Sequence, residues 1–356
     1  MSSRLYLASP RPLAGKTLAA MAVALEARSR GLETGYMKPI GVASSLSGES
    51  PADEDASTIR TVLELEEAAD LLCPFILPRD EYLGEILGLS SEQMRTKISS
   101  TLDSISKDKD VVLIEGPPSC TTGSSISASV PELAAHLDAP IIWLCQFDGD
   151  HALEELISWV RLSRNAGAES RGVVLNKVPK DRLERIGEAA GPILERNDIP
   201  LLGTIHEDSQ LKALTVREIV DAVDGKVLAG EEGLDRLVGP TLVGAMTMES
   251  AIKYFRRARD ELVITGGDRT DIVLAAMEAG ASAVILTGNL YPSVKIFPRA
   301  DDLRIPIILV PHDTFTTLGL VERTSGKIKP SDAERLGRAR DIFSREMNID
   351  LILEGL

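Results

Sequence analysis

Short apolar runs alternate with amphipathic stretches over roughly the first 210 residues of the chain. The runs are rich in Val, Ile and Leu, as in strands that are buried on both faces of a parallel sheet. Six strands are predicted, at residues 5–9, 33–37, 111–114, 140–145, 172–175 and 201–205. Five helices are predicted between them, at residues 16–29, 53–65, 91–105, 152–165 and 181–197. This alternation predicts a doubly wound, mostly parallel α/β sheet, whose ligands bind beyond the carboxyl ends of the strands.

A second, smaller α/β pattern follows a short helical pattern at residues 215–223 and a Gly- and Glu-containing connector at 225–233. Its predicted strands lie at residues 241–245, 261–265, 282–286 and 305–310. Its predicted helices lie at residues 248–259, 270–279 and 314–323. A charged helix at 331–345 and a last strand at 349–353 close the chain. The expected division is therefore a first domain over 1–212, a second over 213–330, and a C-terminal helix and strand over 331–356.

Composition narrows the classes of partner. The net charge of -15 opposes binding to nucleic-acid phosphates and to anionic lipid, so neither nucleic acid nor membrane is expected as a partner. Cys73, Cys120 and Cys145 have no CxxC spacing, and the four histidines have no spacing typical of metal ligands. No apolar run reaches the ~18 residues of a membrane span. The expectation is a soluble, cytoplasmic protein.

The segment between the first predicted strand and helix carries the best candidate chemistry. Residues 9–17, here called the phosphate loop, read Ser-Pro-Arg-Pro-Leu-Ala-Gly-Lys-Thr and end like a Walker A motif. In such a motif backbone N–H groups at the helix start bind phosphate, the lysine adds a charge and the threonine hydroxyl binds Mg²⁺. The candidate nucleotide ligands are Ala14, Gly15, Lys16, Thr17 and Leu18. The first glycine is missing and two prolines remove N–H donors, so an ordinary helix start is the alternative.

Further polar residues follow other predicted strands. Lys38 ends the second strand and is a candidate to face a phosphate or an anionic substrate; the alternative is a solvated lysine. Asp53 and Asp55 precede a helix, where carboxylates also serve as caps. Glu115 follows a buried strand, as a metal-binding acid does in P-loop enzymes. Thr17, one of Asp53 and Asp55, and Glu115 would together form an all-oxygen Mg²⁺ site.

These residues together resemble the dethiobiotin synthetase and cobyrinic acid amide synthetase group of P-loop enzymes. The matching segments are Gly15-Lys16-Thr17, Lys38-Pro39, Asp53 with Asp55, Glu115-Gly116, Asn176-Lys177-Val178 and Gly203-Thr204-Ile205. The match spans about residues 4–211. The resemblance implies a P-loop NTPase fold with ATP and Mg²⁺ as cofactors. It also implies that Asn176 and the loop at Gly203 hold the adenine; a turn residue is the alternative for Asn176.

The chain departs from that group where substrates are handled. The segment Pro117-Pro118-Ser119 replaces a Gly-rich one, and residues 41–44 do not reproduce the substrate serine. A Cys–His–Glu glutaminase module does not follow the P-loop domain. The resemblance therefore supports nucleotide binding better than carboxylation or amide transfer.

The second domain has polar residues after its own strands. Asp268 is expected to cap a helix, and Arg269 to hold an anion or an internal carboxylate. Residues 214–322 resemble the DRTGG domain, although the motif reads Asp-Arg-Thr-Asp-Ile in this chain. The candidate ligands for a small effector are Asp268, Arg269, Thr270, Asp313 and Thr314.

This pair of domains resembles the N-terminal regulatory region of long phosphate acetyltransferases. The chain ends at Leu356, before an acetyltransferase domain, so the resemblance implies an ATP/Mg²⁺-binding regulator or sensor with weak or no turnover. The alternative is an ATP-dependent ligase in which Lys16 and Lys38 stabilise transition-state charge. A scaffold with decayed sites also stays open. The resemblance further implies a homodimer.

Overall fold

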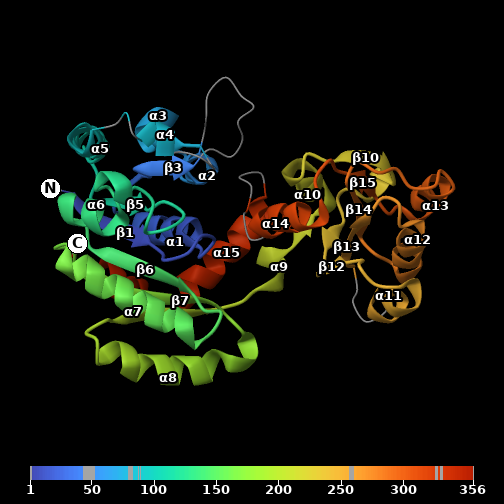
Figure 1. The fold of residues 1–356 in the computed structure, drawn as a ribbon. Helices are drawn as coiled ribbons and strands as arrows, with labels where there is room; N and C mark the ends of the chain where they lie inside the picture. The colour runs from blue at the N-terminus through green and yellow to red at the C-terminus, as the bar shows by residue number, and fades with distance from the viewer. Residues whose placement is uncertain are drawn as a thin grey trace. The chain divides into compact units, whose positions relative to one another are not determined.

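The chain folds into two compact units (Figure 1). The computed structural model describes residues 2–42, 53–78, 83–86, 88, 90–255, 260–324, 328 and 332–355. The first unit comprises Met1–Asp208 together with Ile328–Leu356, and the second comprises Ser209–Lys327. The C-terminal segment thus belongs to the first unit, and the second unit lies within it in sequence.

The first unit is built on a six-stranded parallel sheet in the order β2-β5-β1-β6-β7-β8 (Figure 1). Its strands are β1 (Ser3–Ala8), β2 (Thr34–Met37), β5 (Val111–Glu115), β6 (Ile141–Gln146), β7 (Ser170–Val178) and β8 (Leu201–His206). All six predicted strands are confirmed, with ends shifted by a few residues. The central strand β1 lies between β5 and β6, so its carboxyl end leads into the phosphate loop at the middle of the sheet.

The five predicted helices of the first unit are also confirmed. They are α1 (Lys16–Ser29), α2 (Glu54–Val62), α5 (Ser91–Ile105), α7 (Asp150–Asn165) and α8 (Leu183–Glu195). Helix α1 is rich in buried alanine, which lets it pack closely within the unit. Helix α2 starts one residue later than predicted because Asp53 is its N-cap: the Asp53 carboxylate accepts a 3.0 Å hydrogen bond from the Ala56 N–H.

Several short elements of the first unit were not predicted. They are β3 (Ile40–Val42) and β4 (Phe75–Leu77), which form a separate parallel pair, and the helices α3 (Ala69–Leu72), α4 (Leu83–Ile86) and α6 (Val130–His136). Elements of three to seven residues carry too few positions to show a period of 2 or 3.6. The sequence alone therefore did not reveal them.

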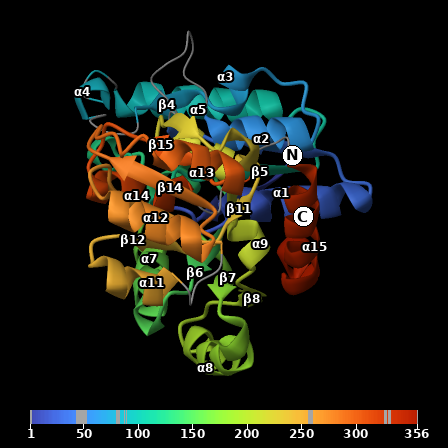
Figure 2. The same cartoon turned by 90° about the vertical axis from the view of Figure 1, so that its right-hand side faces the viewer.

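The second unit has its own five-stranded sheet, in the order β10-β15-β14-β13-β12 (Figures 1 and 2). Its strands are β10 (Lys226–Ala229), β12 (Thr241–Val243), β13 (Leu262–Gly266), β14 (Ala283–Thr287) and β15 (Ile307–Leu309). Its main helices are α10 (Val216–Ala222), α11 (Met248–Phe255), α12 (Thr270–Ala279), α13 (Ile296–Leu303) and α14 (Thr314–Thr324). The last four residues predicted for the helix at 248–259 lie outside the described part of the chain. Helix α9 (Ser209–Lys212) and the small pair β9 (Leu214–Thr215) and β11 (Leu237–Val238) complete the unit.

The connector predicted at 225–233 is not entirely a connector. Its residues 226–229 form the edge strand β10, antiparallel to β15 with Val227 opposite Ile308. An edge strand is buried on fewer sides than a central one, so its apolar pattern is weak in the sequence. Helix α13 was also missed, because it has only eight residues and carries a proline, Pro298, near its start.

The predicted strand at 349–353 is wrong: these residues form helix α16 (Ile349–Leu353). Asn348 caps this helix, its side-chain oxygen accepting a 3.1 Å hydrogen bond from the Leu351 N–H. Its buried residues Ile349, Ile352 and Leu353 have helical spacing, which five residues alone did not reveal. Met347, between α15 (Ala333–Glu346) and α16, forms an isolated bridge to Gly203 of β8, and the Asn348 N–H donates to the Leu202 carbonyl at 2.6 Å.

Glu261, at the start of β13, is a buried acid whose two carboxylate oxygens have no hydrogen-bond partner among the described residues. Burial raises its pKa above the ordinary value of 4.5. The folded protein therefore holds this proton more tightly than the unfolded chain. The protonated carboxyl group thus contributes folding stability that is fully present below pH 4.5, the ordinary pKa expected in the unfolded chain. This contribution is lost as the pH rises through the pKa of Glu261 in the folded protein.

We expect Glu261→Gln to stabilise the second unit by about 1–3 kcal/mol at pH 8 and to change its stability much less at pH 4, because the ionised carboxylate costs much more to bury than a neutral carboxyl or amide group. Urea denaturation at both pH values measures the difference. Glu322→Gln, at an exposed position of α14, is the matched control and should be neutral. Equal effects of Glu261→Gln at the two pH values would contradict the assignment.

Candidate functional site

The phosphate loop turns sharply into α1 at Gly15. This residue has a φ of 92°, in the left-handed region that favours glycine, and Leu13 has a φ of 58°. A Cβ at residue 15 would also lie 2.4 Å from the Asn176 side-chain nitrogen, so only glycine fits. Gly15 offers no side chain to cap α1. The first-turn N–H groups, from Lys16 to Leu18, are therefore the natural donors for an anion.

Lys16 is buried, and its ammonium is held inside the loop. The Lys16 Nζ donates to the Ser9 hydroxyl at 2.8 Å and reaches the Pro118 carbonyl at 3.5 Å. Burial lowers the pKa of Lys16, while nearby Glu115 acts in the opposite direction. Pro10 stands where a full Walker A motif has its first glycine, and Ser9, just before it, is the lysine's acceptor. The sequence indicated that the first glycine is missing but did not indicate the contact between Ser9 and Lys16.

Glu115, the last residue of β5, joins two hydroxyl groups. The Thr17 hydroxyl donates to one carboxylate oxygen of Glu115 at 2.9 Å, and the Tyr36 hydroxyl donates to the other at 2.9 Å. Burial raises the pKa of Glu115 to about 7, against the opposing effect of Lys38. The structure thus brings together the predicted pair Thr17 and Glu115. Tyr36 was missed; its place one strand over and two residues before Lys38 was the available signal.

Lys38 lies at the centre of the predicted carboxylates. Its ammonium is 2.9 Å from an oxygen of Asp53, contacts Asp55, and is 3.8 Å from an oxygen of Glu115. Burial opposes the charged form, but Asp55, Glu115 and Asp53 together raise the pKa of Lys38 well above its usual value. The alternative of a solvated strand-end lysine is wrong, because Lys38 is only 1% exposed. Asp53 serves both as helix cap and as part of this cluster.

The cluster fits Mg²⁺ in its chemistry. One hydroxyl and three carboxylates are the oxygen ligands that Mg²⁺ prefers. In the structure these oxygens surround an ammonium group, and among the described residues no group of His, Cys, Asp or Glu is arranged to hold a metal ion as it stands. A divalent ion bound by these oxygens would compete with the Lys38 ammonium for them.

The two residues expected to hold adenine have other neighbours. Asn176 is buried; its Nδ2 donates to the Ala14 carbonyl at 2.9 Å, and its oxygen accepts from the Lys177 N–H at 2.8 Å. Asn176 therefore ties the end of β7 to the phosphate loop. Gly203, in β8, lies against the C-terminal segment: a Cβ there would be 2.3 Å from the Glu346 carbonyl.

Helix α15 reaches the phosphate loop, which the sequence did not indicate. Phe343 is buried on this helix, and its ring lies 3.4 Å from the position that a Cβ of Gly15 would take. Glu346 binds His206 at 2.8 Å, and Arg338 forms a bidentate ion pair with Asp208 at 2.9 and 2.6 Å. The chain leaves the first unit after Asp208 and returns at Ile328. These two contacts therefore fasten together the segments on either side of the second unit.

The candidate ligands of the second unit lie after β13 and β15, at the carboxyl edge of its sheet. Asp268 was expected to cap α12, and this is wrong: the N-cap is Arg269, and no side chain caps that helix. The Asp268 carboxylate lies over Gly266 instead. Arg269 pairs with Asp271 at 3.2 Å and donates to the Met246 carbonyl at 2.9 Å, which is the predicted internal carboxylate pair.

The remaining candidates also have internal partners. Asp313 accepts a 2.8 Å hydrogen bond from the Thr316 N–H and so caps α14, which lowers the pKa of Asp313. The Thr314 hydroxyl lies 3.1 Å from that of Thr287, and the Thr270 hydroxyl accepts from the Ser293 N–H at 3.4 Å. The cluster is held by contacts within the unit.

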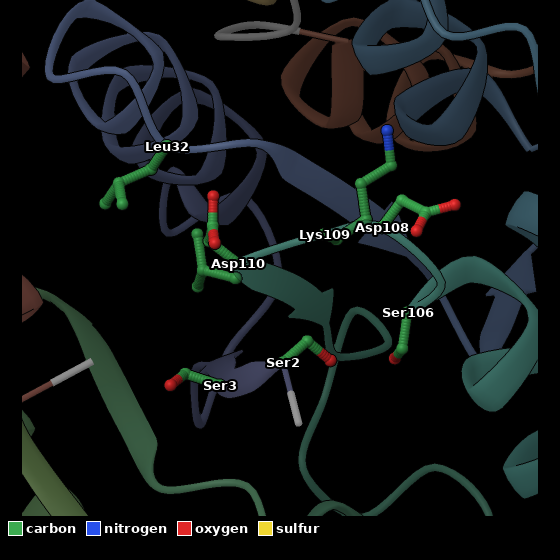
Figure 3. Close-up of a pocket in the computed structure, with 8 residues that line it drawn as sticks. Ser2, Ser3, Leu32, Ser106, Asp108, Lys109 and Asp110 are labelled. Atoms are coloured by element: carbon green, nitrogen blue, oxygen red, sulfur yellow. The ribbon is translucent and has the colours of Figure 1, made fainter.

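Two cavities of the first unit lie beside other elements. One of about 470 Å³, drawn in Figure 3, opens at the amino ends of β1 and β5. This cavity and the phosphate loop lie at opposite ends of the strands, because β1 and β5 are parallel and the phosphate loop follows the carboxyl end of β1. Another, of about 770 Å³, lies between α2 and the segment of α3, with Asp53 in its wall.

Across the described residues no helix is long and apolar enough to cross a membrane.

Two family models match consecutive parts of the chain. The model of an AAA domain, AAA_26, matches residues 3–215, and that of the DRTGG domain matches residues 218–324. The phosphate acetyltransferase of Synechocystis is 25% identical over 376 aligned positions, which cover 100% of this chain and 52% of the relative. The enzyme of Deinococcus radiodurans is 23% identical over 97% of this chain and 50% of its own length. The chain thus spans about half the length of these relatives and is homologous to their N-terminal region.

Partial matches to solved structures were found for each unit. The septum site-determining protein MinD of Pyrococcus horikoshii, complexed with Mg-ADP, is 18% identical over 60% of this chain and 84% of its own, with a TM-score of 0.39. The CBS and DRTGG domains of Clostridium perfringens pyrophosphatase, complexed with diadenosine tetraphosphate, are 23% identical over 39% of this chain and 69% of their own, with a TM-score of 0.27. The AAA_26 model matches more than half of the residues of this chain. The chain therefore belongs to the AAA_26 family of AAA domains, and a DRTGG domain follows the AAA_26 domain.

Proposed function

We propose that the first unit binds ATP with Mg²⁺ and acts as a sensor with weak or no turnover. One observation carries this proposal: directly behind the Gly15-Lys16 turn, the Thr17 hydroxyl and the Glu115 carboxylate lie 2.9 Å apart. A hydroxyl and an acid at this position are the pair with which P-loop proteins hold Mg²⁺. Thr17, Glu115 and one of Asp53 and Asp55 would hold the ion, which would neutralise phosphate charge.

The chain's own groups supply the rest of the site. The N–H groups at the start of α1 are oriented for phosphate oxygens. Lys16 would exchange the Ser9 hydroxyl for a phosphate oxygen, a stronger acceptor because it is charged. Asn176 would keep the loop in place through the Ala14 carbonyl.

A sensing role is supported by α15. This helix places Phe343 beside Gly15 and anchors, through Arg338, the residue after which the chain enters the second unit. A nucleotide at Gly15 would thus lie beside the helix that follows the return of the chain from the second unit. In the second unit we propose a small-molecule effector at the cluster of Asp268, Arg269, Thr270, Asp313 and Thr314.

Isothermal titration of the protein with ATP tests the first proposal. We expect saturable heat in the presence of Mg²⁺ and at least about ten-fold weaker binding with EDTA, because the metal carries part of the phosphate charge. The absence of heat in both conditions would overturn the proposal. The predicted homodimer is tested in the same preparation by light scattering coupled to size exclusion.

The second candidate is an ATP-dependent ligase, which Lys38 favours because its cationic group lies within the metal cluster. That activity predicts ADP release stimulated by a carboxylate or an amine. A panel of such compounds that leaves phosphate and ADP release at background would exclude the ligase and retain the sensor.

A further inference from the structure

The Lys38 ammonium occupies the place in which the carboxylates of the first unit would hold a cation. Asp53, Asp55 and Glu115 all face it, and Asp53 and Glu115 are themselves buried. The ammonium thus has three acidic neighbours from two separate segments of the chain. Glu115 is the last residue of β5, and Asp53 and Asp55 lie at the start of α2.

Charge explains why this arrangement is stable. Three buried carboxylates without a cation would repel one another, and a buried lysine without acids would lose its proton. Together they satisfy each other. Lys16, the other lysine nearby, is directed to Ser9 and Pro118 instead. Lys38 is therefore the cation in direct ionic contact with this cluster among the described residues.

The same oxygens cannot serve an ammonium and a magnesium ion together. Mg²⁺ requires ligand oxygens at about 2.1 Å, so the carboxylates must converge on one point, and Lys38 now fills the space between them. The Lys38 backbone is fixed, since its N–H donates to the Leu72 carbonyl at 2.7 Å and Pro39 follows. Only the flexible side chain can move away, and it then needs another anion.

We propose that Lys38 is a tethered cation that fills the metal position of the nucleotide-free protein, so that a divalent ion binds only together with a nucleotide whose phosphate accepts the displaced ammonium. This inference rests on the proposed ATP site and specifies the order in which its parts assemble. The residue is a specificity determinant: it discriminates against free metal ions and admits the metal–nucleotide complex.

The exchange makes metal and nucleotide binding cooperative. By linkage, the factor by which the nucleotide raises metal affinity equals the factor by which the metal raises nucleotide affinity. Lys38→Met removes the ammonium but keeps the carboxylates and a similar side-chain length. It should increase affinity for the free metal at least about ten-fold, a change of about 1.4 kcal/mol, and reduce the cooperativity. Lys38→Arg keeps the charge and is the matched control.

Electron paramagnetic resonance of Mn²⁺ tests the proposal without any activity measurement, since Mn²⁺ takes the same oxygen ligands as Mg²⁺. Free Mn²⁺ is titrated against wild type, Lys38→Met and Lys38→Arg without nucleotide. We expect weak binding to wild type and Lys38→Arg, and binding at least about ten-fold tighter to Lys38→Met. Equal Mn²⁺ affinity of wild type and Lys38→Met would overturn the proposal.

A second measurement does not depend on the folding of the variant. Mn²⁺ is titrated against wild-type protein with and without a non-hydrolysable ATP analogue, after subtraction of Mn²⁺ bound by the analogue alone. The proposal requires the analogue to raise the protein's Mn²⁺ affinity; an unchanged affinity with the analogue bound would contradict it. If the analogue does not bind at all, the ATP site itself fails, whereas the comparison of Lys38→Met with wild type still judges the role of Lys38.

Discussion

Lys16→Ala is expected to weaken ATP binding by about ten- to a hundred-fold, since a hydrogen bond to a charged group contributes about 1.5–3 kcal/mol. Lys16 is the lysine of the Gly-Lys-Thr turn and is buried beside the first turn of α1. Its present acceptor, the Ser9 hydroxyl, is neutral. A phosphate oxygen that replaces it would form a charge-assisted bond that alanine cannot make.

Titration calorimetry with Mg²⁺ and ATP measures the loss, and circular dichroism confirms that the variant is folded. Lys107→Ala, at an exposed position after α5, is the control for removal of one positive charge from the same unit. It should bind ATP as wild type does. Wild-type affinity in Lys16→Ala would show that the phosphate loop does not hold the nucleotide, whatever binds elsewhere.

Phe343→Ala is expected to destabilise the first unit by about 3–5 kcal/mol, the usual result of removing a buried aromatic ring from a core. Phe343 is 2% exposed and lies on α15, which packs against α1 beside the phosphate loop. The cavity would open at the helix that carries Lys16 and Thr17. The same variant should therefore weaken ATP binding as well, because the loop loses one of its supports.

Urea denaturation followed by circular dichroism provides the measurement. Phe315→Ala is the matched control: this phenylalanine is 87% exposed in the second unit, so its removal should change stability by less than about 0.5 kcal/mol. Similar stability of Phe343→Ala and wild type would mean that the C-terminal segment does not belong to the core of the first unit.

Much of the fold could be predicted because its longer helices and strands show a regular spacing of apolar residues over short stretches of sequence. The bounds of α1, α5 and α12 agree with the sequence prediction to the residue, since each shows its apolar face over ten or more positions. The short pair β3 and β4 was missed because each strand has only three residues, too few to show a period of 2. The strand predicted at 349–353 was wrong because five apolar-rich residues fit a strand and a helix alike.

The candidate site divides in the same way. Gly15, Lys16, Thr17 and Glu115 could be chosen as candidates because they lie at or just beyond the carboxyl ends of strands and are residue types that P-loop chemistry uses. Their partners could not. Ser9 and Phe343 carry no signal of their own, and Tyr36 offers only its place two residues before Lys38. Their roles come from contacts with residues distant in sequence.

What the sequence determined by itself is the presence of two α/β units and of a Gly-Lys-Thr turn at the start of α1, with acidic residues near the ends of other strands. These features depend on periodicity and on residue types at fixed offsets. The tertiary structure alone decided that Lys38 lies inside the carboxylate cluster and that α15 supports the loop. Both depend on side chains that are distant in sequence and share one buried space. The burial and charge balance of such a space belong to the folded chain as a whole.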